Sequence, residues 1–539
     1  MIKKLVVAFS IANLCFFRAW REILSPQTLS RLYFWKEYPI HAAGEALAIN
    51  LLLVTSILLV GFTVLWPRGR LARNFVRVVF LVVLLRALNA VRAQFEPLST
   101  GQLRAFLGSA GYFIAGLIIF GLLIFLIIRF GLTRVARAGV VVALILSPLG
   151  LIGLIQLSWL TVKYRDFWHD QPAAPLLKST NDQPRVVWLI FDEMSEYQAF
   201  ANRPPGFSMP NFDRLRAEAV SATNAFPPAG HTTQSMPALL TGKLIASVKP
   251  SAPDELMLQF PDRPGPVKWS AEPDIFTEAH NAGFNSALVG WFHPYCRIEG
   301  SRLSACVWQP ANLFGDPDRF SFSKNLWKQQ ADLLMLVPGT KLLRTWLSPR
   351  SFDDYRAPHL AAYETLLAAA KRAVVDEKVG LTFIHLPVPH PPYIYDREHA
   401  VSDIKGERQY LDNLALTDRA LGELRNAMEA AGVWERTTLV VSSDHWWRAD
   451  FWRPVKNFWT TGDAAIQSNR VDHRVPLIIR LAGQRTRATY TPAINTVLTR
   501  DLILEFLGRR ISRPDEITDW LDRHRTIGES PYQAYDDPE

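Results

Sequence analysis

The sequence predicts an N-terminal bundle of transmembrane helices, followed by an α/β domain with a mostly parallel sheet and helices on both faces. Two observations lead to this fold class. Long apolar stretches are confined to residues 1–162, and after residue 185 short β-branched runs alternate with helical patterns. Such alternation is typical of parallel sheets that are covered by helices. A chain of 539 residues whose two parts differ this much in composition contains more than one domain.

Four apolar stretches are long enough to cross a bilayer, which takes about 20 residues. They are Ala46–Trp66, Phe75–Ala90, Leu107–Ile128 and Ala138–Leu160. A shorter run, Leu5–Phe17, follows two lysines at the N-terminus. Because no small-residue cleavage site comes after it, we expect a retained first helix and about five helices in this domain.

The charge pattern sets the expected orientation. Arginines gather in the loops at residues 67–77 and 129–137. Positively charged loops stay in the cytoplasm, so everything after Leu160 is expected on the other side. The sequence therefore predicts a multi-pass protein of a bacterial-type inner membrane with a periplasmic second domain. The net charge of +9 is attributed mainly to these loops, so nucleic acid is not an expected partner.

The outer part is expected to form one catalytic domain at residues 185–525. Residues 163–184, rich in Pro, Asp, Gln and Lys, are predicted to be a linker, and residues 526–539 a polar tail. The expected strands are Arg185–Phe191, Asn285–Gly290, Leu381–Leu386, Thr437–Ser443 and Val475–Leu481. The expected helices are Asn211–Val220, Thr232–Leu240, Ile275–Ala282, Tyr363–Val375, Leu411–Ala430 and Thr499–Leu507.

The outer domain contains one pair of cysteines, Cys296 and Cys306. In an oxidising compartment we expect them to form a disulfide. Two free thiols, or half of a zinc site, are the alternatives.

Polar side chains lie at the ends of three expected strands. Asp192-Glu193 closes the first, His385 lies near the end of another, and Asp444-His445 follows a third. In open parallel sheets, ligands bind beyond the carboxyl ends of the strands. Carboxylates and imidazoles are good ligands for a divalent ion. The pattern therefore predicts a metal site made of Asp192, Glu193, Asp444 and His445, with zinc as the first choice and manganese as the second.

A candidate nucleophile stands at the expected start of a helix. Thr232 and Thr233 follow Pro227-Pro-Ala-Gly230. The free N–H groups and the dipole of a helix N-terminus favour an anionic phosphate or sulfate. A metal ion also makes a hydroxyl a competent nucleophile. We take Thr232 as the nucleophile and Thr233 as the alternative, while a simple capping role is the plainer interpretation of either residue alone.

The order of these motifs resembles that of the alkaline phosphatase/sulfatase superfamily over about residues 185–481. The acidic pair, the segment Met209-Pro-Asn-Phe-Asp-Arg-Leu215 and the ending Leu239-Leu-Thr-Gly242 follow one another as they do in sulfatases. This alignment puts Thr232 at the nucleophile position. Asp444-His445 and His473-Arg-Val-Pro476 match the later metal and substrate elements.

The threonine and the preceding apolar stretches resemble the membrane-anchored branch: lipoteichoic acid synthases, phosphoglycerol transferases and phosphoethanolamine transferases. Sulfatases need Cys or Ser to make formylglycine, so Thr232 makes sulfate-ester hydrolysis less expected. The resemblance implies that the threonine takes a head group from a phospholipid donor, releases diacylglycerol and passes the head group to a glycan or lipid acceptor. It also implies that His385, His390 and His473 bind substrate.

Two residues depart from the phosphoethanolamine transferases. Ala238 stands where they have Cys, and Trp446 stands where they have Gly, so the donor head group stays open. The main alternative is a sulfatase-like hydrolase that passes the intermediate to water, acting as a phosphodiesterase, a phosphatase or a sulfuric ester hydrolase. A non-catalytic glycan-binding domain is another. Trp446 and Trp447 are expected either to stack on a sugar or to be buried.

Overall fold

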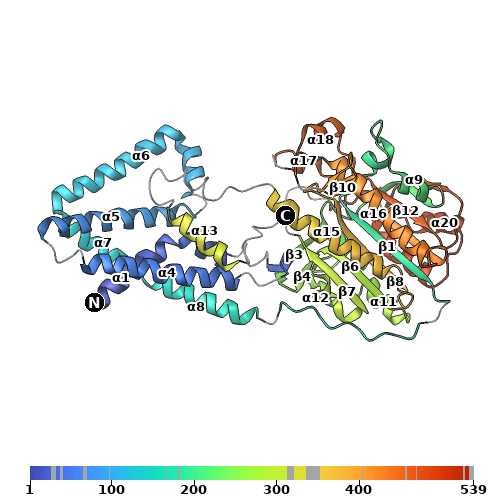
Figure 1. Ribbon diagram of the computed structural model, residues 1–539, viewed down its shortest axis with the longest axis horizontal. Coiled ribbons are helices and arrows are strands. Elements are labelled where there is room, and N and C mark those ends of the chain that lie inside the picture. Colours follow the sequence, from blue (N-terminus) through green and yellow to red (C-terminus); the bar gives the residue numbers. More distant parts are fainter. Residues whose placement is uncertain are drawn as a thin grey trace. The chain divides into compact units, whose positions relative to one another are not determined.

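The structure of the protein is a computed structural model. It describes residues 1–25, 32–36, 40–64, 69–95, 98–165, 167–179, 182–311, 321–334, 353–402, 405–455, 458–468, 470–525 and 528–532. The chain divides into two compact units, and Figure 1 labels many of their elements. Of the described residues, the first unit takes 1–25, 40–165 and 321–334, and the second unit takes the others.

The first unit is helical in its described residues. Its helices are α1 (Ile2–Cys15), α2 (Phe17–Leu24), α4 (Ile40–Val64), α5 (Arg70–Arg92), α6 (Thr100–Phe130), α7 (Leu132–Leu146), α8 (Pro148–Lys163) and α13 (Phe322–Leu334). Stretches long and apolar enough to cross a membrane are His41–Thr63, Arg70–Arg92, Thr100–Phe130 and Leu132–Lys163. These stretches overlap the four predicted spans. α6 buries none of its residues although it is strongly apolar, a surface that suits hydrocarbon better than water.

The predicted first helix is also present. Val7, Ile11 and Leu14 of α1 are buried in one apolar cluster with Phe80 and Leu84 of α5. α1 is therefore part of the packed core of the first unit.

Two segments belong to a different unit from the one expected from their position in the sequence. α13 comes from within the predicted outer domain, yet it packs on α4. There the side-chain amide of Asn50 donates to Gln329 Oε1 at 3.0 Å and accepts from Gln330 Nε2 at 3.0 Å. Conversely, residues 32–36 precede α4 but belong to the second unit, where Arg297 donates to the carbonyl oxygens of residues 35 and 36.

The second unit is built on a mixed sheet with the strand order β13-β2-β12-β11-β1-β8-β6-β7. Its strands are β1 (Arg185–Asp192), β2 (Val220–Phe226), β6 (Ser286–Phe292), β7 (Ala305–Pro310), β8 (Leu381–Pro389), β11 (Thr437–Ser443), β12 (Val475–Arg480), β13 (Ala488–Tyr490) and β14 (Ile494–Asn495), which pairs with β2. The run β11-β1-β8-β6-β7 is parallel, whereas β12 is antiparallel to both of its neighbours. The predicted mostly parallel sheet is confirmed.

Helices cover both faces of this sheet (Figure 1). In β1, Val186, Trp188 and Ile190 enter one apolar core, while Val187 and the alternate residues that follow it enter the other. The first core includes residues of α10 (Thr232–Thr241), α11 (Ile275–Asn281), α19 (Thr499–Leu507) and α20 (Pro514–His524). The second includes residues of α9 (Pro210–Arg216), α15 (Asp353–Ala373) and α16 (Tyr410–Ala430). Burial on both faces explains why the central strands are almost uniformly apolar.

The predicted helix Asn211–Val220 is wrong at its end. α9 ends at Arg216, and Val220 begins β2, where it pairs with Ile479 of β12. β2 and β7 were not predicted, because pairing within the sheet, rather than local pattern, makes them strands. Smaller elements complete the unit: β3 (Ser247–Ala252), β4 (Glu255–Gln259), β5 (Val267–Lys268), β9 (Tyr395–Asp396), β10 (Val401–Ser402), α12 (Tyr295–Ile298), α17 (Ala449–Trp452) and α18 (Thr461–Ile466).

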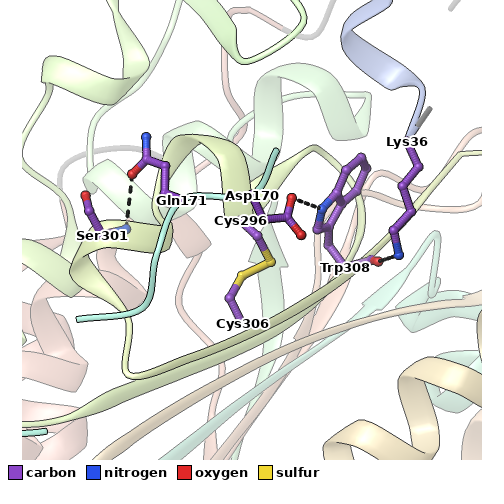
Figure 2. The surroundings of a disulfide bond; sticks show 7 residues. All are labelled: Lys36, Asp170, Gln171, Cys296, Ser301, Cys306 and Trp308. Atoms are coloured by element: carbon purple, nitrogen blue, oxygen red, sulfur yellow. Dashed lines mark hydrogen bonds between the residues drawn. A yellow bond between two sulfur atoms is a disulfide. The ribbon is translucent and has the colours of Figure 1, made fainter. Parts of the chain in front are cut away.

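A disulfide joins Cys296 of α12 to Cys306 of β7, as predicted (Figure 2). The segment predicted as a linker is hydrogen-bonded to this region. Asp170 accepts a hydrogen bond from the indole of Trp308 at 2.9 Å, and the side chain of Gln171 accepts one from the Ser301 N–H at 3.1 Å. Residues 167–179 are therefore part of the second unit. Of the predicted polar tail, residues 528–532 are described and the others lie outside the described residues.

Candidate active site

Most of the predicted site residues gather where neighbouring strands end and one helix begins. Asp192 is the last residue of β1, His385 lies in β8, and Asp444 and His445 follow β11. Thr232 is the first residue of α10. All five residues are completely buried, with 0% exposure. Because the three strands are parallel neighbours, their carboxyl ends meet at one edge of the sheet.

The hydroxyl of Thr232 lies between a carboxylate and an imidazole. Its Oγ1 donates to Asp192 Oδ2 at 3.3 Å and lies 3.2 Å from His445 Nε2. The other ring nitrogen of His445, Nδ1, lies 2.9 Å from the carbonyl oxygen of Trp446. A proton on Nδ1 satisfies that carbonyl and leaves the lone pair of Nε2 directed at the cluster. Burial also lowers the pKa of His445 well below its ordinary value, so the ring is neutral.

Asp192, Asp444 and His445 are placed to hold a metal ion. Each offers one ligand atom, and these atoms all lie within 4.8 Å of one another. Burial, and then the charge of Asp192, raises the pKa of Asp444 to about 8. Two buried carboxylates this close are costly unless a cation compensates them. Two carboxylates and an imidazole are also a donor set that zinc or manganese accepts, so the residues present fit a divalent ion.

Hydroxyl groups tie the strand ends together beneath this group. Ser443 Oγ accepts a hydrogen bond from the Met194 N–H at 2.8 Å and donates to the carbonyl oxygen of Phe191 at 2.7 Å, which links β11 to β1. Ser235 Oγ donates to the carbonyl oxygen of Asp444 and links α10 to the end of β11. These hydrogen bonds join β1, β11 and α10, the elements that position Asp192, Asp444 and Thr232.

Glu193 is turned away from this group. Its φ of 67° lies in the left-handed region, which residues other than glycine rarely adopt. Its carboxylate accepts hydrogen bonds from the Trp452 indole at 2.7 Å, from the Arg448 backbone N–H at 2.9 Å and from Arg448 Nε at 3.3 Å. The sequence predicts Glu193 as a metal ligand, but the structure does not bring it together with the other three predicted ligands.

The predicted substrate histidine His385 does join the cluster. Its Nε2 lies 3.2 Å from Asp192 Oδ2. Its Nδ1 lies 3.1 Å from the carbonyl oxygen of Trp291 and 3.3 Å from the hydroxyl of Tyr295. Burial lowers the pKa of His385 to about 4, so its ring is neutral near pH 7.

The other two predicted substrate histidines lie beside the cluster. His390 Nε2 is 3.9 Å from Glu193 Oε2, and its ring meets that of Trp452 edge to face. His473 packs on Trp446, with ring centroids 4.2 Å apart, and its Nδ1 contacts Glu529. Neither contact includes Thr232 or the candidate metal ligands, so the substrate role of both histidines remains a prediction.

Two residues that contact the Thr232 region were not predicted. His293 Nε2 lies 3.2 Å from the carbonyl oxygen of Thr232, and its Nδ1 lies 2.7 Å from the hydroxyl of Tyr33. His293 directly follows β6, so extending the predicted strand from Gly290 to Phe292 would have placed it at the same sheet edge. Tyr33 comes from the segment 32–36, and no pattern in the sequence connects it with this site.

Tyr295, also not predicted, reaches His385 because residue 290 is a glycine. A Cβ at Gly290 would collide with the Tyr295 ring. The two tryptophans after the metal motif are buried: Trp447 stacks on Tyr410 with ring centroids 4.4 Å apart, and Trp446 is 1% exposed. This confirms burial, the second of the two interpretations given for these tryptophans.

The sequence of the second unit is similar to that of a known protein family. Residues 184–507 match the family model described as Sulfatase. An ulvan-active sulfatase of Formosa agariphila is 24% identical over 358 residues, which cover 62% of this chain and 63% of that protein. The chain therefore spans less than two thirds of the length of that relative.

Among solved structures, the PsFucS1 sulfatase from Pseudoalteromonas sp. has a TM-score of 0.40 and 16% identity, covering 63% of this chain and 74% of that chain. The phosphonate monoester hydrolase of Agrobacterium radiobacter has a TM-score of 0.38 and 14% identity, covering 60% and 74%. Because these structural likenesses are distant, the family assignment rests on the sequence match.

Proposed function

Because the chain belongs to the sulfatase family, we propose that it is a membrane-bound, metal-dependent phosphotransferase that works through a phospho-threonine at Thr232. It takes phosphoglycerol or phosphoethanolamine from a phospholipid and passes it to a glycan or lipid acceptor. One observation carries this proposal. The Thr232 hydroxyl lies 3.3 Å from Asp192 and 3.2 Å from His445, in a chain whose described residues include four helical stretches long and apolar enough to cross a membrane.

The reaction proceeds in two displacements at phosphorus. Thr232 Oγ1 loses its proton and bonds to the phosphorus, the bond from phosphorus to the glycerol oxygen of the lipid breaks, and diacylglycerol leaves with a proton. An acceptor hydroxyl then loses its proton and bonds to the same phosphorus, while the bond to Thr232 breaks and its oxygen regains a proton. A bound divalent ion would lower the pKa of the Thr232 hydroxyl and neutralise charge on the phosphoryl oxygens.

The protein's own groups supply position and hydrogen bonds. Thr232 is the first residue of α10, and the start of a helix favours an anionic group such as a phosphoryl group. With its proton on Nε2, the neutral imidazole of His385 can donate a hydrogen bond to a phosphoryl oxygen. Complete burial lowers the local dielectric and strengthens each of these interactions.

The nucleophile distinguishes this proposal from sulfate-ester hydrolysis. Formylglycine is made from Cys or Ser, and this chain has threonine at the matching position. A hydrolase remains the second candidate function, and the sulfatase family match favours it. For a phosphate ester the two candidates differ in whether the acceptor is water or another hydroxyl, and a sulfuric ester hydrolase would differ in the ester as well.

We also propose that the second unit lies outside the cytoplasm and that the ion is zinc or, as a second choice, manganese. The arginines at residues 70–77 and 129–137 support that orientation, because basic loops stay in the cytoplasm. The disulfide supports it as well, because such bonds persist mainly in oxidising compartments.

The proposal is tested by peptide mass spectrometry of the purified full chain after incubation with mixed phosphatidylglycerol and phosphatidylethanolamine. We expect a head-group adduct on the peptide that contains Thr232, together with released diacylglycerol. The mass of the adduct identifies the donor. Thr232→Ala removes both signals, and Thr233→Ala, the matched control, keeps both.

Two results would contradict the proposal. Release of head group without transfer to any acceptor, in the presence of candidate glycans, would support the hydrolase. A protein that binds metal but gives neither adduct nor diacylglycerol would exclude phospholipids as donors and Thr232 as their nucleophile.

A further inference from the structure

The first unit contains a cavity of about 260 Å³ that the proposed reaction does not use. It is lined by residues of α1, α4, α5 and α7. Four basic side chains line it, together with one hydroxyl: Lys3, Lys4, Arg77, Arg137 and Thr133. Among the described residues that line this cavity, none is acidic. The cavity therefore has a positive potential that an anion would balance.

The rest of the lining is apolar. Val7 and Phe80 are buried in the core that joins α1 to α5, and Phe62 and Val140 add further hydrocarbon surface. A small soluble anion would gain nothing from such a wall. A molecule with a phosphate at one end and a hydrocarbon chain at the other matches both parts of the lining.

The basic residues lie toward the N-terminal ends of three helices, α1, α5 and α7. Lys3 and Lys4 are in the first turn of α1, Arg77 is near the start of α5, and Arg137 is near the start of α7. The loops that precede α5 and α7 hold the arginines that favour the cytoplasm. On the orientation proposed above, the cavity faces the cytoplasmic leaflet, which carries anionic lipids.

The hydrogen bonds at the rim position two of these cations. Lys4 Nζ donates to the carbonyl oxygen of Phe62 at 2.9 Å, which ties α1 to α4. Arg77 Nη1 donates to Asn74 Oδ1 at 2.8 Å, on the same helix. Both of these acceptors are neutral, so the bonds orient the side chains without cancelling their charge.

We propose that this cavity binds an anionic phospholipid of the cytoplasmic leaflet. Its phosphate lies against Lys4, Arg77 and Arg137, and one acyl chain lies along Val7, Phe80 and Val140. The inference rests on the proposed function only for the orientation in the membrane, and it does not depend on which reaction Thr232 performs. Its experiment measures binding, so its failure is distinct from a failure of the proposed function.

The test is native mass spectrometry of the full chain released from detergent, titrated with phosphatidylglycerol and, separately, with phosphatidylcholine of the same acyl chains. We expect tighter binding of phosphatidylglycerol. Each lost charge near an anionic lipid head group lowers affinity about fivefold, so Arg77→Gln/Arg137→Gln should weaken phosphatidylglycerol binding by about 25-fold. Phosphatidylcholine binding should weaken much less, because the choline cation offsets the charge of its phosphate. Arg134→Gln is the matched control, since Arg134 lies on α7 but does not line the cavity.

Two further experiments test whether the loss of binding is due to charge rather than to misfolding, and whether the cavity binds a lipid rather than a free anion. Arg77→Lys/Arg137→Lys keeps both charges and should retain most of the preference for phosphatidylglycerol. Glycerol 3-phosphate in millimolar excess should not displace the lipid. Equal loss in the Arg134 control, no loss in the double glutamine variant, or displacement by glycerol 3-phosphate would each overturn the proposal.

Discussion

Asp192 and Glu193 are neighbours in the sequence, yet their carboxylates enter two regions with opposite charge balance. Asp192 faces Thr232, His385 and His445, with a second carboxylate, Asp444, in the same cluster. Glu193 instead faces the guanidinium of Arg448. The first region collects negative charge that an added cation would balance, whereas the second balances its charge with an arginine of the chain. Neighbouring acids at a strand end therefore need not share a function.

A third carboxylate of the same segment follows neither pattern. Glu196 is 4% exposed and sits near Arg216 and Arg474, but burial outweighs both cations and raises its pKa to about 8. Its side chain is therefore protonated in the folded protein near neutral pH. The segment from 192 to 196 thus contains a candidate metal ligand, an ion-paired acid and a protonated acid.

The largest expected effect is on the Asp192 region. Thr232→Ala should lower head-group transfer by about 10⁴-fold or more, because the bond-forming oxygen is lost. Thr233→Ala, in the same turn of α10, should change the rate by no more than about threefold. Diacylglycerol release from labelled phospholipid measures both. A larger loss in the Thr233 variant would move the nucleophile by one residue.

The Glu193 region should respond in stability. Glu193→Ala leaves Arg448 buried beside a missing acid, which is expected to lower the free energy of unfolding by about 3–5 kcal/mol. Denaturant unfolding of the purified full chain, followed by tryptophan fluorescence, measures this. Glu377→Ala, which breaks the exposed ion pair with Arg436, is the control and should change little. Equal losses of unfolding free energy for Glu193→Ala and Glu377→Ala would mean that the buried ion pair of Glu193 and Arg448 stabilises the fold no more than an exposed pair.

Glu196 should give a smaller, pH-dependent effect. Its ordinary pKa is near 4.5 and its folded pKa is about 8, so between these values the folded protein holds a proton that the unfolded chain has released. Stability therefore falls as pH rises through this window. Glu196→Gln removes the penalty and should be close to the parent at pH 5 but more stable at pH 8, by up to about 4 kcal/mol.

The measurement is the unfolding free energy of both proteins at pH 5 and pH 8. Glu364→Gln, an exposed substitution with the same charge change, serves as the control. A difference between Glu196→Gln and the parent that does not change with pH would show that Glu196 is already ionised at pH 5 in the folded protein.

The smallest expected effect comes from the other side of Thr232. Tyr33→Phe removes the hydroxyl that lies 2.7 Å from His293, whose ring in turn contacts the Thr232 carbonyl oxygen. One such hydrogen bond contributes about 1 kcal/mol, so kcat should fall about fivefold with KM unchanged. Tyr197→Phe, which removes a hydroxyl bonded to Asn202, should leave kcat unchanged. An increase in KM alone for Tyr33→Phe would exclude a positioning role.

Much of the fold could be predicted because local pattern and tertiary structure agree in the central strands. β11 and α19 have the predicted bounds, since an apolar run with clear polar limits is also the segment that the core requires. β2 could not be predicted, because its sequence, Val-Ser-Ala-Thr-Asn-Ala-Phe, becomes a strand by pairing with β12, β13 and β14. Tertiary contacts likewise decide that α13 belongs to the first unit and residues 32–36 to the second.

In the candidate site, too, some features could be predicted from the sequence and others depend on tertiary contacts. Asp192, Thr232, Asp444 and His445 could be predicted because each stands at a strand or helix end, and topology brings such ends together. The direction of a side chain could not be predicted: Glu193 turns away through a left-handed backbone and meets Arg448. The contact between Tyr33 and His293 could not be predicted because the two residues are 260 positions apart in the sequence.

The most direct test of the contrast between these two neighbouring acids is the metal content of three proteins purified side by side: the parent, Asp192→Asn and Glu193→Gln. Inductively coupled plasma mass spectrometry counts the ions per chain after dialysis against zinc or manganese. We predict about one ion per chain in the parent and in Glu193→Gln, and roughly tenfold less in Asp192→Asn. Loss of the ion from Glu193→Gln with retention in Asp192→Asn would contradict the account.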